Sequence, residues 1–238
     1  DPQSMIFSPP FALLAWLMPA VTAHAVDTTV LLLMLSGGIA IQLWFHDRGW
    51  HWGGGVLAAI VFLFGGAMAW LIQHTGQVLS LVYMAWTLWA MARALERRSV
   101  AWGALAGIFA ALMLLGRDQI SLVGLYLLVG YALWHLFAHD NAGSPGRWLP
   151  ALLAGLVVCV VLMALPVALT LSLAAESNRP LIDLEGAGRG SLHPALLVTL
   201  LTPDVFGASG RMEDYWGPPS FTWEGTGLYI AQNVGQMY

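Results

Sequence analysis

Six long apolar stretches, separated by short polar breaks, constrain this chain more than any other feature. A helix rises about 1.5 Å per residue, so about 20 mostly apolar residues cross the hydrocarbon core of a bilayer. The stretches that reach or approach this length are 28–45, 53–72, 78–94, 101–115, 120–137 and 149–175. The stretch 101–115 is short and needs a turn from its flanks or a locally thinner bilayer. We therefore predict an all-α, polytopic membrane helix bundle of about six spans, together with an irregular segment that contains short helix.

Charged side chains are scarce: they make up 9% of the 238 residues, whereas 58% of the residues are hydrophobic. A soluble globular domain has about 25% charged residues. These figures exclude a soluble enzyme, a disordered tail and a nucleic-acid binder with a basic groove. The single cysteine, Cys159, excludes an internal disulfide framework, and its apolar neighbours favour an inert packed thiol.

The distribution of charge divides the chain. Acidic and basic residues balance in 1–175, so the whole formal charge of −4 comes from 176–238. Pro19, His24 and Asp27 interrupt the chain before the stretch 28–45 begins, so we interpret the apolar run 11–25 as a half-helix at the membrane interface. We expect an interfacial segment at 1–27, a helix bundle at 28–175 and a polar segment at 176–238. We also expect the sequence to be a fragment that stops before a further span.

The loops between the predicted spans differ in their arginine content. Loops 46–52, 93–100 and 138–148 contain Arg48, Arg93, Arg97, Arg98 and Arg147, whereas loops 73–77 and 116–119 contain Arg117 alone. Arginine-rich short loops stay in the cytoplasm. The turns QHTGQ (73–77) and GRDQ (116–119) and the segment 176–238 should therefore share the extracytoplasmic face. The spans themselves contain almost no ionisable group, which argues against an ion-coupled transporter.

These two turns carry the first set of candidate binding residues. The planar fork of Arg117 suits a phosphate, and His74 can donate to a phosphate or a sugar hydroxyl. The alternatives are an ion pair of Arg117 with Asp118 or a guanidinium that reaches the headgroups, and a hydrogen-bonded loop cap for His74. The candidates are His74, Gln77, Arg117, Asp118 and Gln119.

The segment 176–238 carries the second set. Aromatic rings beside carboxylates form a platform for a sugar, because the apolar sugar face stacks and the carboxylates accept hydroxyl hydrogen bonds. A carboxylate there can also act as a general base or hold a divalent cation, and the sequence indicates no other cofactor. The alternative is a proline-locked loop whose tryptophans anchor in headgroups. The candidates are Asp204, Glu213, Asp214, Trp216, Trp223 and Glu224.

A pair of histidines, His135 and His139, lies four residues apart on one predicted helix. This spacing suits a metal ion, but no clear third ligand accompanies it, so interfacial packing is favoured. We therefore assign no metal site to this histidine pair.

Several ordered strings resemble the YfhO-like family of large bacterial membrane proteins. They are DPQSMIFSPPF (1–11), FLFGGAMAWLIQHTGQVLSL (62–81), RALERRS (93–99), LLGRDQISLVGLYLL (114–128), SNRP (177–180), TPDVFGASG (202–210) and YWGPPSFTWEGTGLY (215–229). The resemblance implies a distant relation to GT-C glycosyltransferases, which move a sugar from a polyprenyl-phosphate carrier to an acceptor on the outer membrane face. In those enzymes the catalytic carboxylate lies in the first outer loop, which would precede Asp1, so no catalytic residue is assigned here.

Two functions follow from these expectations. The first is a polyprenyl-phosphate-sugar-dependent glycosyltransferase that acts on a cell-envelope glycopolymer in the bacterial inner membrane. The second is a non-enzymatic assembly subunit or a lipid or polymer exporter that uses the same face for binding. Membrane lipids, a polyprenyl-phosphate-linked sugar and the glycopolymer are the expected partners, and no nucleic acid is expected.

Overall fold

The computed structural model describes the chain in ranges. These are residues 7–18, 20–65, 68, 72, 74–116, 119–138, 148–176, 194–202, 205–207, 216–217, 221–222 and 229–230.

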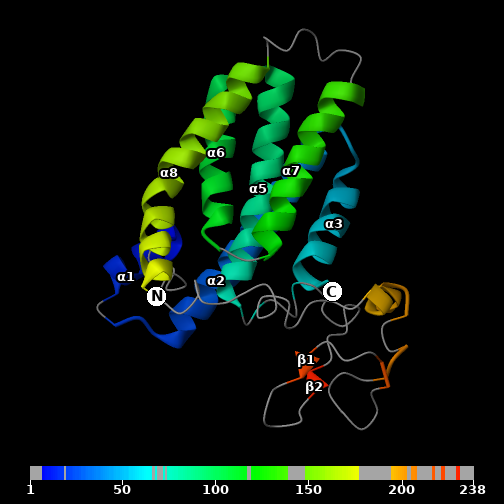
Figure 1. Ribbon diagram of the computed structural model, residues 1–238. Coiled ribbons are helices and arrows are strands. Elements are labelled where there is room, and N and C mark those ends of the chain that lie inside the picture. Colours follow the sequence, from blue (N-terminus) through cyan, green and yellow to red (C-terminus); the bar gives the residue numbers. More distant parts are fainter. Residues whose placement is uncertain are drawn as a thin grey trace. The chain divides into compact units, whose positions relative to one another are not determined.

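Helices dominate the described residues (Figure 1). They are α1 (Pro9–Leu17), α2 (Ala23–Asp47), α3 (Trp52–Phe64), α5 (Thr75–Arg97), α6 (Val100–Leu114), α7 (Gln119–Ala138) and α8 (Leu149–Ala175). Among the described residues, α2, α5 and α8 are long and apolar enough to cross a membrane, and α3, α6 and α7 are shorter apolar helices. The predicted all-α membrane helix bundle is confirmed, and a described helix overlaps each of the six apolar stretches.

The start of α2 differs from the prediction. We expected one half-helix over 11–25 and a span from residue 28, but α1 ends at Leu17 and α2 begins at Ala23. The side chain of Thr22 accepts a hydrogen bond from the backbone N–H of Ala25, at 3.3 Å. This cap starts the helix before His24 and Asp27, so these two polar residues lie within α2 and do not interrupt it.

Helix α3 is shorter than the predicted span over 53–72. It ends at Phe64, where the N–H of Gly65 donates to the carbonyl of Val61 at 2.8 Å and the backbone turns to an extended conformation. A helix of 13 residues is about 20 Å long, less than the hydrocarbon thickness. The prediction missed this end because the apolar run continues past the glycine.

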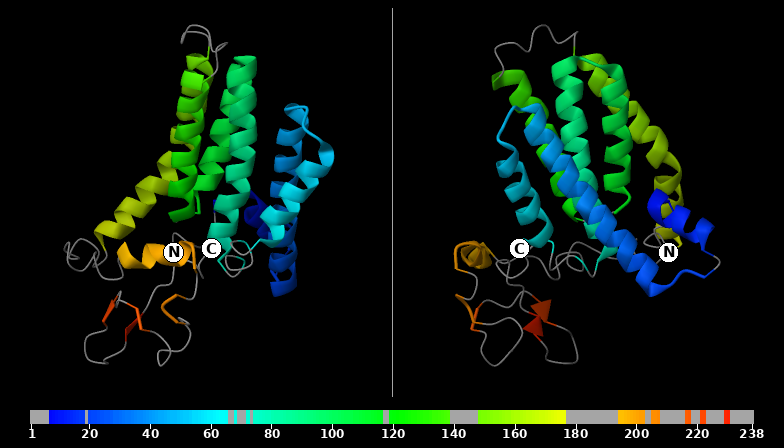
Figure 2. Two further views of the ribbon diagram at one scale, coloured as in Figure 1. Left: turned by 90° about the vertical axis from the view of Figure 1, so that its right-hand side faces the viewer. Right: turned by 180° about the vertical axis from the view of Figure 1, so that it is seen from behind.

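Helix α5 forms the centre of the bundle. It packs against α2, α6 and α7, and α2 also packs against α3 (Figure 2). Of the three long helices, α5 is the least apolar and the most buried, whereas α8 is the most apolar and the most exposed. This order is typical of a membrane bundle, because polar side chains such as Ser80 and Thr87 avoid lipid by lying inside.

The chain divides into two compact units, residues 1–170 and 171–238. The second unit contains the end of α8, a 3₁₀ helix (Pro194–Leu200) and an antiparallel pair of two-residue strands, β1 (Phe221–Thr222) and β2 (Tyr229–Ile230). In this pair Phe221 lies opposite Ile230, and Thr222 lies opposite Tyr229. The 3₁₀ helix agrees with the prediction of an irregular segment that contains short helix.

Candidate functional site

The first turns of α5 and α7 lie side by side at one end of the bundle, which we call the α5–α7 end. The hydroxyl oxygens of Ser80 and Ser121 are 3.4 Å apart, and both side chains are fully buried. The Ser80 hydroxyl is also 3.2 Å from the carbonyl oxygen of Met113, near the end of α6. These contacts join the beginning of α5, the end of α6 and the beginning of α7, so the described residues His74, Gln77 and Gln119 belong to helix starts at the same end.

His74 and Gln77 begin α5 at this end. His74 occupies the N-cap position with an exposed side chain that makes no cap hydrogen bond. Gln77 is half-buried, and its Oε1 atom is fully buried with no hydrogen-bond partner among the described residues. A buried carbonyl oxygen without a donor costs about 1–3 kcal/mol. Such an oxygen is a ready acceptor for a hydroxyl or N–H group brought in by a ligand.

Gln119 is the first residue of α7 and is exposed. The other candidates of the two turns, Arg117 and Asp118, lie outside the described residues. The same is true of most candidates from the C-terminal segment, namely Asp204, Glu213, Asp214, Trp223 and Glu224.

Trp216 is the described candidate of the C-terminal segment. Its side chain is 69% exposed, yet it is anchored by Phe206, whose ring centroid lies 5.1 Å away in an edge-to-face arrangement. The backbone N–H of Trp216 donates to the carbonyl of Phe206 at 3.0 Å. Phe206 is not among the residues that the sequence patterns indicate. The glycine after it, Gly207, could have pointed to a turn at this place, because it adopts a φ of 86°.

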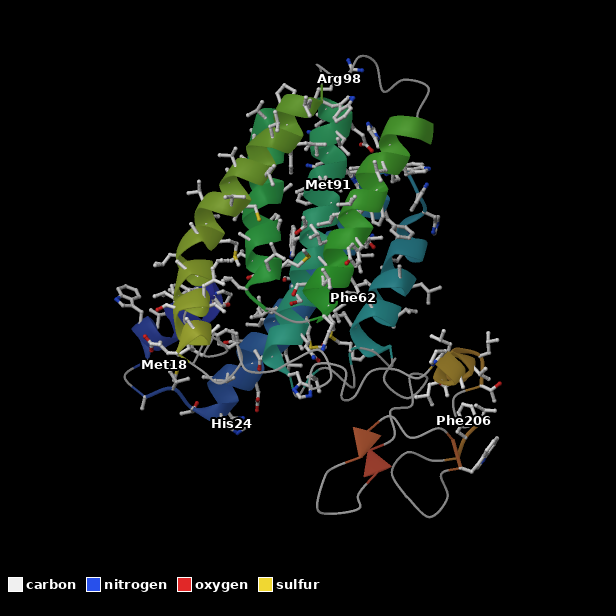
Figure 3. All side chains as sticks on the ribbon, viewed as in Figure 1. Met18, His24, Phe62, Met91, Arg98 and Phe206 are labelled. Carbon is white, nitrogen blue, oxygen red and sulfur yellow. The ribbon has the colours of Figure 1, made fainter. Side chains whose placement is uncertain are left out.

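The opposite end of the bundle, which we call the arginine end, is where α2 and α5 end. Figure 3 shows Arg98 at this end and His24 at the other. The Asp47 carboxylate accepts two hydrogen bonds from Arg93, at 2.5 and 2.6 Å, and one from the indole of Trp89 at 2.9 Å. Arg48 pairs with Glu96 at 2.8 Å and also donates to the hydroxyl of Tyr131. Sequence patterning missed this network because its partners are far apart in the chain.

The predicted histidine pair is described in part. His135 is buried on α7, and His139 lies outside the described residues. Within the described ranges, no group of three or more His, Cys, Asp or Glu side chains is placed to hold a metal ion.

An apolar cavity of about 200 Å³ lies between α5, α6, α7 and α8. Gly103 and Gly107 of α6 line it together with Gly155 and Cys159 of α8. A side chain at Gly107 would overlap the carbonyl oxygen of Gly155, so α6 and α8 approach closely because these positions are glycine. Cys159 is half-buried in this apolar lining, in agreement with a packed thiol.

One family model matches the chain. It is described as dolichyl-phosphate-mannose-protein mannosyltransferase and covers residues 7–164, more than half of the sequence. No curated protein and no solved structure matches the chain. The GT-C-like relation that the sequence resemblance implied is confirmed by this match, whereas the resemblance to the YfhO-like family itself stays a prediction.

Proposed function

Because the chain belongs to the dolichyl-phosphate-mannose-protein mannosyltransferase family, we propose that it transfers a sugar from a polyprenyl-phosphate carrier to a cell-envelope glycopolymer. The chain is a membrane glycosyltransferase-like protein built of apolar helices. In the proposed reaction an acceptor hydroxyl attacks the anomeric carbon of the sugar. A glycosidic bond forms, the bond between that carbon and the phosphate oxygen breaks, and the carrier phosphate leaves.

The α5–α7 end is the proposed site for the carrier phosphate. Arg117, with His74, donates hydrogen bonds to the phosphate oxygens and balances the charge that grows as the phosphate leaves. Gln77, Asp118 and Gln119 contact the sugar or the phosphate beside them. The contact between Ser80 and Ser121 is the observation that supports this proposal, because it joins the beginnings of α5 and α7, next to which these residues lie in the sequence.

The acceptor is proposed to bind the C-terminal segment. Trp216, held at its edge by Phe206, offers an exposed ring for the apolar face of a sugar. Trp223 provides a second ring, and the carboxylates of Asp204, Glu213, Asp214 and Glu224 accept hydroxyl hydrogen bonds. One of these carboxylates accepts the proton of the attacking hydroxyl.

We place the α5–α7 end and residues 176–238 outside the cytoplasm, in the inner membrane of a bacterium. The gathering of Arg48, Arg93, Arg97 and Arg98 at the opposite end supports this orientation, because arginine-rich ends stay in the cytoplasm. Cysteine accessibility tests it: a cysteine at Thr75 should react with an impermeant reagent added outside the cell. Labelling from the cytoplasmic side alone contradicts the orientation.

Transfer of radiolabelled sugar from its polyprenyl-phosphate carrier, by the full-length protein in its membrane, tests the activity. Arg117→Ala should lower transfer by about 100-fold, the usual effect of removing one donor to a developing charge. Asp118→Asn should also lower it. Arg98→Gln is the matched control, since it removes the same charge at the opposite end and should leave transfer unchanged. Unchanged transfer in both site variants removes these residues from the mechanism, and no transfer by the unmodified protein rejects the enzyme.

A further inference from the structure

Arg97 ends helix α5 at the arginine end and contacts the aromatic ring of Trp102. The centre of its guanidinium lies 5.6 Å from the Trp102 ring centroid, within cation–π range. A short turn, Arg98–Ser99, leads from Arg97 into α6. The Ser99 hydroxyl caps α6 by accepting a hydrogen bond from the backbone N–H of Trp102, at 3.4 Å. Arg97 is exposed, and its ring partner is fixed on the next helix.

Two arginines near Arg97, namely Arg93 and Arg48, already have acidic partners. Arg93 is bound at two points by Asp47, and Arg48 is bound by Glu96. Arg97 forms no salt bridge with a carboxylate in the described part of the chain. The guanidinium of Arg93 also lies over the Trp102 ring, 4.6 Å from its centroid. Among the described residues, the exposed guanidinium of Arg97 therefore adds a positive charge that no carboxylate pairs.

The surroundings of Arg97 belong to a membrane surface. Arg97 is the last residue of a helix long and apolar enough to span, and Val100 of the next helix is 54% exposed. Trp50 and Trp52, at the α2–α3 turn of the same end, are also more than half exposed. Exposed tryptophan beside exposed apolar residues at the ends of spanning helices is typical of the headgroup layer.

We propose that Arg97, steadied by Trp102, binds the phosphate of an anionic phospholipid headgroup. The guanidinium donates paired hydrogen bonds to the phosphate oxygens, a geometry that a lysine ammonium does not reproduce. Stacking on Trp102 restricts the arginine side chain before the lipid arrives, so less entropy is lost on binding. This site lies at the other end of the bundle from the proposed transfer site and does not depend on the proposed reaction.

The test is a titration of the purified full-length protein in a neutral detergent. The thermal unfolding midpoint is followed against dioctanoyl phosphatidylglycerol, dioctanoyl phosphatidylcholine and inorganic phosphate in separate arms. Phosphatidylglycerol should raise the midpoint most, and Arg97→Gln should weaken its apparent affinity about fivefold, the effect of one arginine near an anionic surface. Arg97→Lys keeps the charge but loses the planar fork, so its apparent affinity for phosphatidylglycerol should lie between those of the unmodified protein and of Arg97→Gln.

Arg98→Gln is the matched control, because it removes the same charge one residue away and keeps Arg97, the cation that lies over Trp102. It should change the apparent affinity much less than Arg97→Gln does. Equal stabilisation by phosphatidylglycerol and phosphatidylcholine overturns the proposal. An equal loss of affinity for phosphatidylglycerol in Arg97→Gln and Arg98→Gln also overturns it, since the effect would then come from general charge. If inorganic phosphate raises the midpoint as much as phosphatidylglycerol does, the site binds free phosphate and the lipid proposal is wrong.

Discussion

The Asp47 carboxylate and the Arg93 guanidinium form a two-point ion pair that fastens the end of α2 to α5. The Nε and Nη2 atoms of Arg93 lie 2.5 and 2.6 Å from Oδ2 and Oδ1 of Asp47. Trp89 donates to the same carboxylate, and the guanidinium stands over both the Trp89 and the Trp102 rings. The side chains of Asp47 and Arg93 are only 13% and 18% exposed, so each charge has little water around it and depends on the other as its counter-charge.

Asp47→Asn should therefore destabilise the bundle strongly. The substitution keeps the shape of the side chain but leaves a guanidinium without its counter-charge in a mostly buried place. Breaking such a pair on one side costs about 3 kcal/mol. The free energy of unfolding, measured in mixed micelles with increasing denaturing detergent, checks this value.

The control for this prediction is Glu96→Gln. It breaks the ion pair with Arg48, in which the two side chains are 21% and 32% exposed and better hydrated. A pair of this kind is worth about 1 kcal/mol or less. Losses of equal size in the two variants would show that burial does not set the strength of the Asp47–Arg93 pair.

Gly107→Ala should separate α6 from α8. A methyl group at Gly107 overlaps the carbonyl oxygen of Gly155, and backbone atoms cannot move aside as a flexible side chain does. Overpacking of this type costs about 1–3 kcal/mol. The same detergent titration measures the loss.

Gly130→Ala provides the matched control, because a methyl group at Gly130 of α7 meets nothing within 4 Å. Alanine is the better helix former by about 1 kcal/mol, so this variant should be neutral or more stable. If both alanines lower stability alike, then the α6–α8 contact is not what Gly107 provides.

The positions of the helices could be predicted from the sequence, whereas some of their ends could not. Long apolar runs locate α2, α5, α7 and α8, because a bilayer demands length and apolarity. The end of α3 at Phe64 depends instead on a glycine within an apolar run, and the start of α2 depends on one hydroxyl of Thr22. Hydropathy averages over such single-residue caps, so it misplaces the ends.

The candidate site was predictable to a similar extent. The alternation of loops predicted that His74 and Gln119 lie in turns on one membrane face, and the Ser80–Ser121 contact joins the beginnings of α5 and α7 next to them. The Asp47–Arg93 pair and the support of Trp216 by Phe206 involve residues that no local pattern connects. Pairings between distant segments depend on how helices and turns pack, which periodicity does not report.

His51→Ala should loosen the beginning of α3. The Nδ1 atom of His51 accepts a hydrogen bond from the Gly53 N–H at 3.1 Å and so caps a helix that starts with three glycines after Trp52. Loss of an N-cap costs about 1 kcal/mol. Amide hydrogen exchange in the first turn of α3 should become about fivefold faster, as that free energy implies. His46→Ala, which replaces an 83% exposed side chain, should leave this exchange unchanged; faster exchange in both variants would contradict the cap.

Gln77→Leu should make the protein more stable and less active. The buried Oε1 of Gln77 has no donor among the described residues, so replacing the amide with an apolar side chain removes an unpaid desolvation cost of about 1 kcal/mol or more. If the amide contacts the sugar or its phosphate, the same change lowers transfer. Gln42→Leu is the control: its Oε1 is also buried and has no partner in the described ranges, but Gln42 lies at the α2–α3 contact, where its amide donates to the Trp52 carbonyl at 3.4 Å. That variant should change stability and leave transfer intact. The unfolding midpoint and the sugar-transfer rate, measured on one preparation of each variant, separate the outcomes. A stabilised Gln77→Leu with full activity would assign Gln77 to packing, and a destabilised one would mean that its amide is already satisfied in the resting protein.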